Sequence, residues 1–183
     1  MSDAPKMVSA GIDRIFLDLE NPRHDPYEDE AQVIEYLVRH ENIQPLAKDI
    51  AKNGLNPLEL LALIPDEGSA NGKGEPTYVV AEGNRRLCAL KLLDDPERAP
   101  TKQRKSFENL AADWEGVGDL PCMVFPDRES VKMWLSRIHE GEQGGIGRKK
   151  WNADQTARHS GESKNKVALA VLDYAESEGL ISS

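Results

Sequence analysis

Two adjacent arginines that directly follow a glycine, in the segment Gly83-Asn84-Arg85-Arg86, are the residues best suited to bind an anion. Residues 77–81 are β-branched and aromatic and predict a strand, whereas residues 84–93 have a helical period. The first N–H groups of a helix lack intrahelical partners and lie at the positive end of its dipole. The positive end of the helix repels cationic side chains, so two arginines in the first turn need an anion or a carboxylate to offset that repulsion. We therefore expect this turn to bind a di- or triphosphate.

Glu82, immediately before the glycine, leaves two alternatives open. It can pair with Arg85 or Arg86, in which case the segment is an ordinary helix start on the surface. Alternatively, its carboxylate can position Mg²⁺ or a water molecule, which makes Glu82 the candidate catalytic residue of a phosphate-hydrolysing site.

One short basic segment stands out from an acidic chain whose net charge is −9. Residues 146–166 carry six cationic side chains against two anionic ones, a charge pattern that indicates contact with nucleic acid. The candidate nucleic-acid-binding residues are Arg148, Lys149, Lys150, Arg158, Ser163, Lys164 and Lys166.

The same segment has the spacing of a helix-turn-helix unit, with Ala157, Gly161 and Val167 at the positions where the two helices cross and turn. Asn152 and Ser163 would cap the two helices. The alternative is a helical hairpin with a solvated basic edge. A lone unit makes few phosphate contacts, so useful specificity would require a homodimer or a protein partner. The inner face of the second helix would hold Val167, Val171, Leu172 and Ala175.

The rest of the chain alternates between strand and helix patterns. Strands are expected at residues 14–19, 58–64, 77–81 and 121–125, and helices at 29–39, 84–93, 107–114 and 127–138, with a further helix that has Pro45 in its first turn and ends at Gly54. Residues 66–76 are expected to be an exposed loop. Four glycines in residues 141–147 predict a flexible joint. The expected organisation is a domain at 10–138, a glycine-rich basic linker at 139–150 and a helical unit at 151–180.

Three segments in order resemble the ParB/sulfiredoxin superfamily: the Gly83 turn, Asn21-Pro22-Arg23, and residues 46–58, LAKDIAKNGLNPL. The resemblance covers roughly residues 10 to 136. It implies an α+β fold, a compact domain with a small mixed sheet, that binds ATP or CTP, with Mg²⁺. It also implies that Gly83, Asn84, Arg85 and Arg86 hold phosphates, that Arg23 reaches them, and that Asn56 lies near the other end of the nucleotide.

The chain departs from this family at the residue after the glycine. Sulfiredoxins have their reactive cysteine there, whereas this chain has Asn84, and Cys88 lies one helical turn further on. Sulfinic-acid reduction is therefore not expected. Partition ParB proteins usually have a glutamate there, and Asn84 is neutral. Our leading hypothesis is a ParB-like nucleotide- and DNA-binding protein of bacterial or phage type. The alternatives are an NTPase, phosphotransferase or nuclease on the same fold, and an adaptor that binds no nucleotide.

Composition narrows the remaining classes of protein. No run of residues is apolar enough to span a membrane, and no secretory signal is visible at the start. The two cysteines and four histidines lack the spacing of a metal site, so no metal site on the protein is expected. A cytoplasmic protein without a membrane partner is the expectation.

Overall fold

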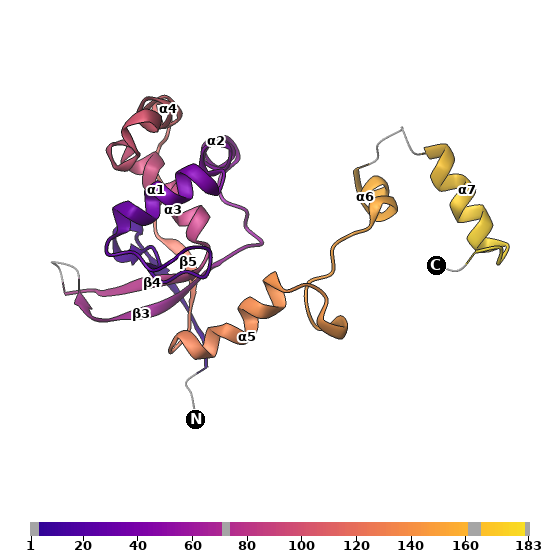
Figure 1. Cartoon of the computed structure of the whole chain (residues 1–183), viewed down its shortest axis with the longest axis horizontal. Helices are drawn as coiled ribbons and strands as arrows, with labels where there is room; N and C mark the ends of the chain where they lie inside the picture. The colour runs from indigo at the N-terminus through magenta and orange to yellow at the C-terminus, as the bar shows by residue number, and fades with distance from the viewer. Residues whose placement is uncertain (1–3, 71–73, 161–165, 182–183) are drawn as a thin grey trace. The chain divides into compact units, whose positions relative to one another are not determined.

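The chain forms an α+β fold around a five-stranded mixed sheet, as the sequence predicts (Figure 1). The computed structural model describes residues 4–70, 74–160 and 166–181. The chain divides into two compact units, Met1–Leu135 and Ser136–Ser183. No helix in the described ranges is long and apolar enough to cross a membrane.

The sheet has the strand order β1-β5-β3-β4-β2. Its long central hairpin consists of β3 (Leu61–Ala70) and β4 (Pro76–Glu82), which pair antiparallel. On one side β5 (Leu120–Val124) runs parallel to β3 and antiparallel to β1 (Lys6–Ala10). On the other side β2 (Ile15–Phe16) runs parallel to β4.

Three predicted strand boundaries are wrong. The strand expected at 14–19 shortens to β2, because a 3₁₀ turn, η1 (Ile12–Arg14), occupies its start. The strand expected at 58–64 begins at Leu61, since the N–H of Leu58 donates to Asn56 Oδ1 in a local turn. The loop expected at 66–76 is strand up to Ala70, since β3 pairs with β4 there. No pattern in the sequence indicated β1, because its residues are mostly exposed and do not alternate clearly between polar and apolar types.

The five helices predicted before residue 140 are all present, but the one expected at 107–114 begins earlier, at Thr101, and ends at Ala111. They are α1 (Glu30–His40), α2 (Ile43–Asn53), α3 (Asn84–Asp94), α4 (Thr101–Ala111) and α5 (Arg128–His139), with a 3₁₀ turn η2 (Pro96–Arg98) after α3. The side chain of Asp29 accepts a hydrogen bond from the N–H of Gln32 and caps α1. Gly54, with φ +78°, ends α2 as expected.

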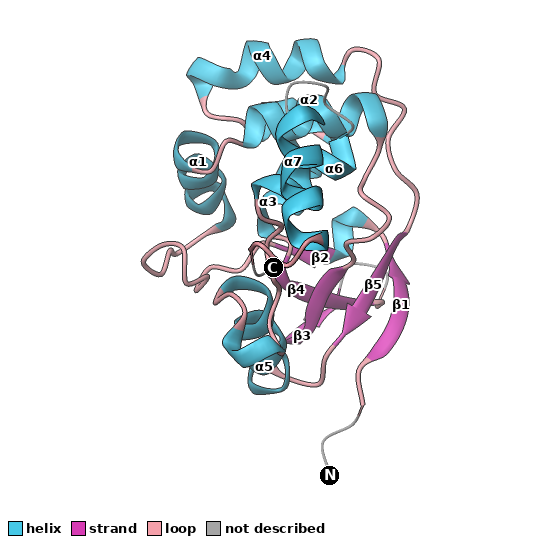
Figure 2. Cartoon of the chain, turned by 90° about the vertical axis from the view of Figure 1, so that its right-hand side faces the viewer, coloured by secondary structure: helices cyan, strands magenta, loops and turns pink. Residues whose placement is uncertain are grey.

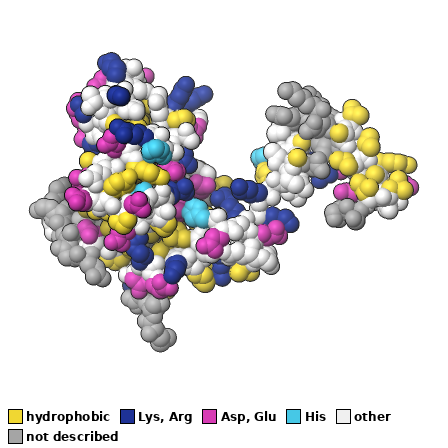
Figure 3. Space-filling model, in the orientation of Figure 1, with side chains coloured by type: hydrophobic (Ala, Val, Ile, Leu, Met, Phe, Trp, Pro, Cys, Tyr) yellow, Lys and Arg dark blue, Asp and Glu magenta, His cyan; other side chains and the backbone are white. Residues whose placement is uncertain are grey.

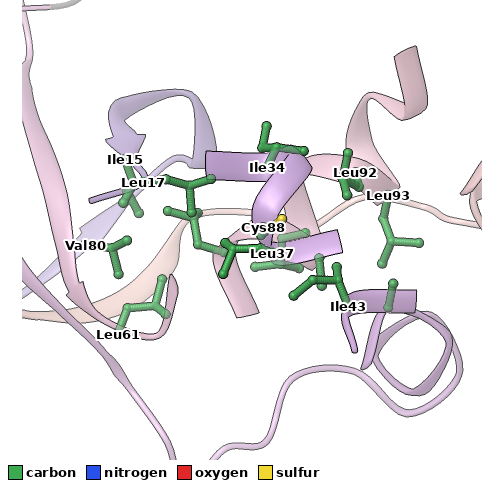
Figure 4. Close-up of a cluster of buried hydrophobic side chains, with 14 of the residues drawn as sticks. Ile15, Leu17, Ile34, Leu37, Ile43, Leu61, Val80, Cys88, Leu92 and Leu93 are labelled. Carbon is green, nitrogen blue, oxygen red and sulfur yellow. The ribbon is translucent and has the colours of Figure 1, made fainter. Parts of the chain in front are cut away.

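Helices cover both faces of the sheet (Figure 2). Successive strand residues point to opposite faces, so Leu63 and Val80 join the main core, whereas Ile64 and Ala81 join a smaller cluster with Val131 of α5. The main core lies between the sheet and helices α1 to α3, and Figure 4 shows its side chains converging. Helix α3 is buried along most of its length, so its first turn is fixed rigidly relative to the sheet.

The second unit contains a 3₁₀ turn η3 (Gln143–Gly145) and two helices, α6 (Ala153–Ser160) and α7 (Lys166–Ser177). Asn152 caps α6, since its Oδ1 accepts a hydrogen bond of 2.8 Å from the N–H of Gln155. The predicted inner face of α7 is wrong at Val167 and Val171, which are 80% and 62% exposed. Arg158 of α6 pairs with Asp173 of α7 at 2.6 Å. Asp173 comes two residues after Val171 and therefore lies on nearly the opposite side of α7, about 200° around the helix axis. Hydrophobic side chains are therefore exposed on α7 (Figure 3).

Candidate functional site

The turn between β4 and α3 requires a glycine at position 83. Gly83 has φ +105°, and a Cβ at this residue would lie 2.3 Å from Leu61 Cδ2. The first intrahelical bond of α3 runs from the N–H of Leu87 to the carbonyl of Gly83 at 2.9 Å. The N–H groups of residues 84–86 precede that bond, at the positive end of the helix dipole. The local geometry is therefore that of an anion-binding helix start.

The side chain of Asn84 is engaged inside the domain. It is buried, its Oδ1 accepts a hydrogen bond of 3.0 Å from the N–H of Asp18, and its Nδ2 donates to the carbonyl of Val80 at 3.1 Å. The amide thereby links the segment after β2 to β4. What Asn84 can offer to a ligand is its backbone N–H.

Arg86 is held by two acidic residues on the sheet side of the turn. Its Nη2 lies 3.3 Å from Glu82 Oε1, and its Nη1 donates to the carbonyl of Glu59 and lies 3.7 Å from Glu59 Oε2. Its side chain is only 13% exposed. Glu82, the candidate catalytic carboxylate, is thus paired with one of the predicted phosphate ligands.

Arg23 and Arg85 come from distant parts of the sequence and meet at one carboxylate. Arg23 Nη1 lies 3.2 Å from Glu41 Oε2, and Arg85 Nε lies 4.0 Å from the same oxygen. Arg85 Nε also donates to the carbonyl of Glu41 at 2.8 Å. The two arginine side chains are 43% and 40% exposed, so both guanidinium groups can reach a ligand in solvent. We call Arg23, Glu41 and Arg85 the shared-carboxylate cluster.

Asn56, the other predicted nucleotide contact, lies in the loop between α2 and β3. Its Oδ1 accepts from the N–H of Leu58 at 3.1 Å, and its carbonyl accepts from the N–H of Glu59 at 3.1 Å. These bonds shape the loop that carries Glu59 to Arg86. The structure thus connects Asn56 to the Arg86 side of the turn through the loop and records no contact from it to the shared-carboxylate cluster.

Behind the turn, a buried carboxylate pairs with a half-exposed arginine, a contact that the sequence did not indicate. Asp18 is 1% exposed, and both its carboxylate oxygens accept hydrogen bonds from Arg128, at 2.7 and 2.8 Å. These hydrogen bonds raise the pKa of Arg128. Because Asn84 bonds the N–H of Asp18, the pair also braces the first residue of α3. Asp18 and Arg128 line a hollow of about 730 Å³ beside β2 and β4.

A second buried ionic group joins α1 to α3. Glu30 accepts the N–H of Leu17 at 2.8 Å, lies 3.3 Å from Lys91 Nζ, and accepts a hydrogen bond from Arg98. Burial lowers the pKa of Lys91, and the carboxylate of Glu30 acts against that shift. Burial also raises the pKa of Cys88, so this thiol is neutral and shielded rather than reactive.

Two of the predicted nucleic-acid contacts have acidic partners. Arg158 pairs with Asp173 at 2.6 Å, and Lys149 Nζ lies 3.3 Å from Glu142. Arg148 is fixed through its backbone, whose N–H donates to the carbonyl of Arg137 at 2.8 Å. Lys150 is exposed, and Lys166 is the first residue of α7. Ser163 and Lys164, together with the Gly161 turn, lie outside the described residues.

The fold and the turn define an α+β domain with an arginine-lined helix start. In the ranges that the structure describes, no three His, Cys, Asp or Glu side chains gather as a metal site. Neither protein-family profiles nor curated protein sequences match the chain. Among solved structures, the chain is similar to the C-terminally truncated chromosome-partitioning protein ParB from Caulobacter crescentus, complexed with CTP-gamma-S. The identity is 18% and the TM-score is 0.44, over 84% of this chain and 60% of that chain.

Proposed function

We propose that this chain binds the phosphates of a nucleoside triphosphate between the first turn of α3 and the side chains of Arg23 and Arg85. The observation that carries the proposal is the convergence of two half-exposed guanidinium groups on one carboxylate beside a helix N-terminus. Two exposed arginines repel each other, so such an arrangement favours an anion with more than one charge. A triphosphate can contact both guanidinium groups and the free N–H groups of the helix at once.

Arg86 and Glu82 have different roles in this proposal. Arg86 is largely buried and paired, so it fixes the turn. Arg85 and Arg23 are half-exposed and provide the positive charge that a ligand can contact. The Glu82 carboxylate is directed to Arg86, and this pairing disfavours the hydrolytic alternatives, in which Glu82 would position Mg²⁺ or water. Mg²⁺ would enter with the nucleotide. CTP and ATP are both candidates, because the contacts described involve phosphates rather than the base.

A thermal-shift titration with ATP, CTP and GTP in the presence of Mg²⁺ tests the proposal. A ligand at a hundred times its Kd stabilises a protein by about 2.7 kcal/mol, which for this size raises Tm by roughly 5–10 °C. Arg23→Ala with Arg85→Ala should abolish the shift. Arg39→Ala is the matched control, since Arg39 is an exposed arginine on α1 that pairs with Glu35. If no nucleotide raises Tm, the nucleotide-binding proposal is excluded, and the adaptor that binds no nucleotide is the alternative that remains.

The hydrolytic alternatives have their own readout. Phosphate release that continues at the wild-type rate in Glu82→Gln would exclude Glu82 as a catalytic residue. Release that stops while the thermal shift persists would instead support an NTPase.

We also propose that the second unit contacts DNA, as a homodimer or beside a protein partner. The support is the exposed basic run that precedes the capped helix α6. Fluorescence anisotropy with duplex DNA at two salt concentrations would measure it, because phosphate contacts give a steep salt dependence. Lys164→Glu with Lys166→Glu should weaken binding, whereas the control Lys102→Glu with Lys105→Glu changes the same charge on α4. Equal binding by both double variants would exclude the proposed recognition helix.

A further inference from the structure

Glu41 is the residue at which the two candidate phosphate-binding arginines meet, and no motif in the sequence singles it out. It is the residue that ends α1, and its side chain is 21% exposed, less than either arginine. Its carboxylate contacts Arg23 and its carbonyl accepts the Arg85 Nε–H. The chain therefore holds an anion of its own at the place where we propose that a phosphate binds.

The position of this carboxylate is unfavourable apart from the arginines. The C-terminal end of a helix carries partial negative charge, so an acidic residue there is repelled by the dipole. In the described structure, Arg23 and Arg85 offset that repulsion. An anion that binds both arginines would leave Glu41 beside the negative end of α1 without a counter-charge. The binding free energy of the ligand must therefore exceed this electrostatic cost.

We propose that Glu41 is a specificity-determining residue that excludes singly charged anions from the arginine pair and gives way to polyphosphates. This inference rests on the proposed phosphate site. A tethered group competes at an effective concentration on the order of millimolar. A singly charged anion offers no more charge than the carboxylate that it must displace. A triphosphate carries several charges and gains the N–H groups of the α3 start, so it can displace Glu41 into solvent.

The proposal predicts that removing the charge of Glu41 strengthens binding and reduces selectivity. Exposed ion pairs are individually weak, so releasing two arginines should raise anion affinity by about twofold to thirtyfold. The increase should be proportionally largest for inorganic phosphate, which in the wild type cannot compete. The selectivity for tripolyphosphate over inorganic phosphate should therefore fall.

Isothermal titration of the full chain with inorganic phosphate, pyrophosphate and tripolyphosphate tests this prediction, at a mildly acidic pH where inorganic phosphate is mainly the singly charged dihydrogen ion. Glu41→Gln removes the charge and keeps the side-chain size, while Glu35→Gln is the matched control. Glu35 lies on the same helix, is 48% exposed and pairs with Arg39 away from the arginine cluster. Higher affinity in Glu41→Gln but not in Glu35→Gln supports the proposal. Affinity that is unchanged or lower in Glu41→Gln, with wild-type binding intact, overturns it.

Two further results separate this inference from the proposed function. If neither wild type nor Glu41→Gln binds tripolyphosphate or a nucleotide, the proposed function fails and this inference fails with it. If Glu41→Gln does not fold by circular dichroism, Glu41→Asp replaces it, because a shorter carboxylate sits further from both guanidinium groups. Glu41→Asp should then bind inorganic phosphate more tightly than wild type, and equal or weaker binding overturns the proposal.

Discussion

Arg85 and Arg86 follow one another in the first turn of α3, yet their guanidinium groups have different surroundings. Arg86 is 13% exposed and lies against Glu82 and Glu59, whereas Arg85 is 40% exposed and shares Glu41 with Arg23. At Arg86 one cation faces two carboxylates, and at Glu41 one carboxylate faces two cations. The first arrangement is a satisfied structural contact, whereas the second leaves an excess of positive charge at the surface. One turn therefore carries a shielded arginine next to a half-exposed one, and the proposed function assigns ligand binding to the second.

The largest expected effect concerns the turn that carries both arginines. Gly83→Ala places a Cβ 2.3 Å from Leu61 Cδ2 at a φ of +105°, so both a clash and backbone strain arise. Each of these costs about 1–3 kcal/mol, so urea denaturation should show a loss of about 2–6 kcal/mol in the free energy of unfolding.

Gly118→Ala is the control for this change. Gly118 has no positive φ and no atom within 4 Å of a Cβ. Its substitution should leave the free energy of unfolding nearly unchanged. Equal losses in the two variants would mean that the turn is not specially constrained, and the contrast between the two arginines would lose its structural basis.

Replacing each arginine separately should give the next largest effect. Arg86→Ala removes charge-assisted hydrogen bonds in a mostly buried position, and we expect it to lower the free energy of unfolding by about 1.5–3 kcal/mol. Arg85→Ala should lower it by less than about 1 kcal/mol, because its ion pair is exposed, while removing most of the nucleotide-induced thermal shift. Denaturation and thermal-shift titration on the same two variants measure both quantities. The reverse assignment, with Arg85 stabilising and Arg86 binding, would contradict the roles proposed above.

The sequence predicted the Gly83 turn and, through the family resemblance, Arg23, but it did not indicate the carboxylates that the arginines contact. The Gly83 turn was predictable because a strand pattern, a glycine and a helical period are adjacent in the chain. Glu41 and Glu59 were not, since they lie 44 and 27 residues from the arginines that they contact. Asn84 shows the same limit: its residue type permitted a ligand contact, and only the fold shows that its side chain bonds Asp18 and Val80.

The elements of the fold that could be predicted are those that a regular local pattern defines. Helices α1 and α2 each bury one regular stripe, and α1 begins at the cap Asp29 while α2 ends at Gly54, so their positions followed from periodicity and capping. β1 is mostly exposed and is defined by its pairing with β5, more than a hundred residues later in the chain. In α7, the apolar residues that predicted an inner face at Val167 and Val171 are exposed instead. Periodicity identifies an amphipathic helix but does not show which neighbour covers it.

The smallest expected effect is the coupling energy within each arginine cluster. A double-mutant cycle on Arg86 and Glu82 should give a coupling of about 1 kcal/mol, because the pair is mostly shielded and its atoms lie 3.3 Å apart. The cycle on Arg85 and Glu41 should give less than about 0.3 kcal/mol, since the Arg85 side chain is half-exposed and the two charged atoms lie 4.0 Å apart. Salt should reduce the second coupling more than the first, because exposed charges are screened more strongly. A coupling at Arg85 and Glu41 as large as that at Arg86 and Glu82 would show a fixed structural ion pair, and this result would contradict the contrast drawn between the two arginines.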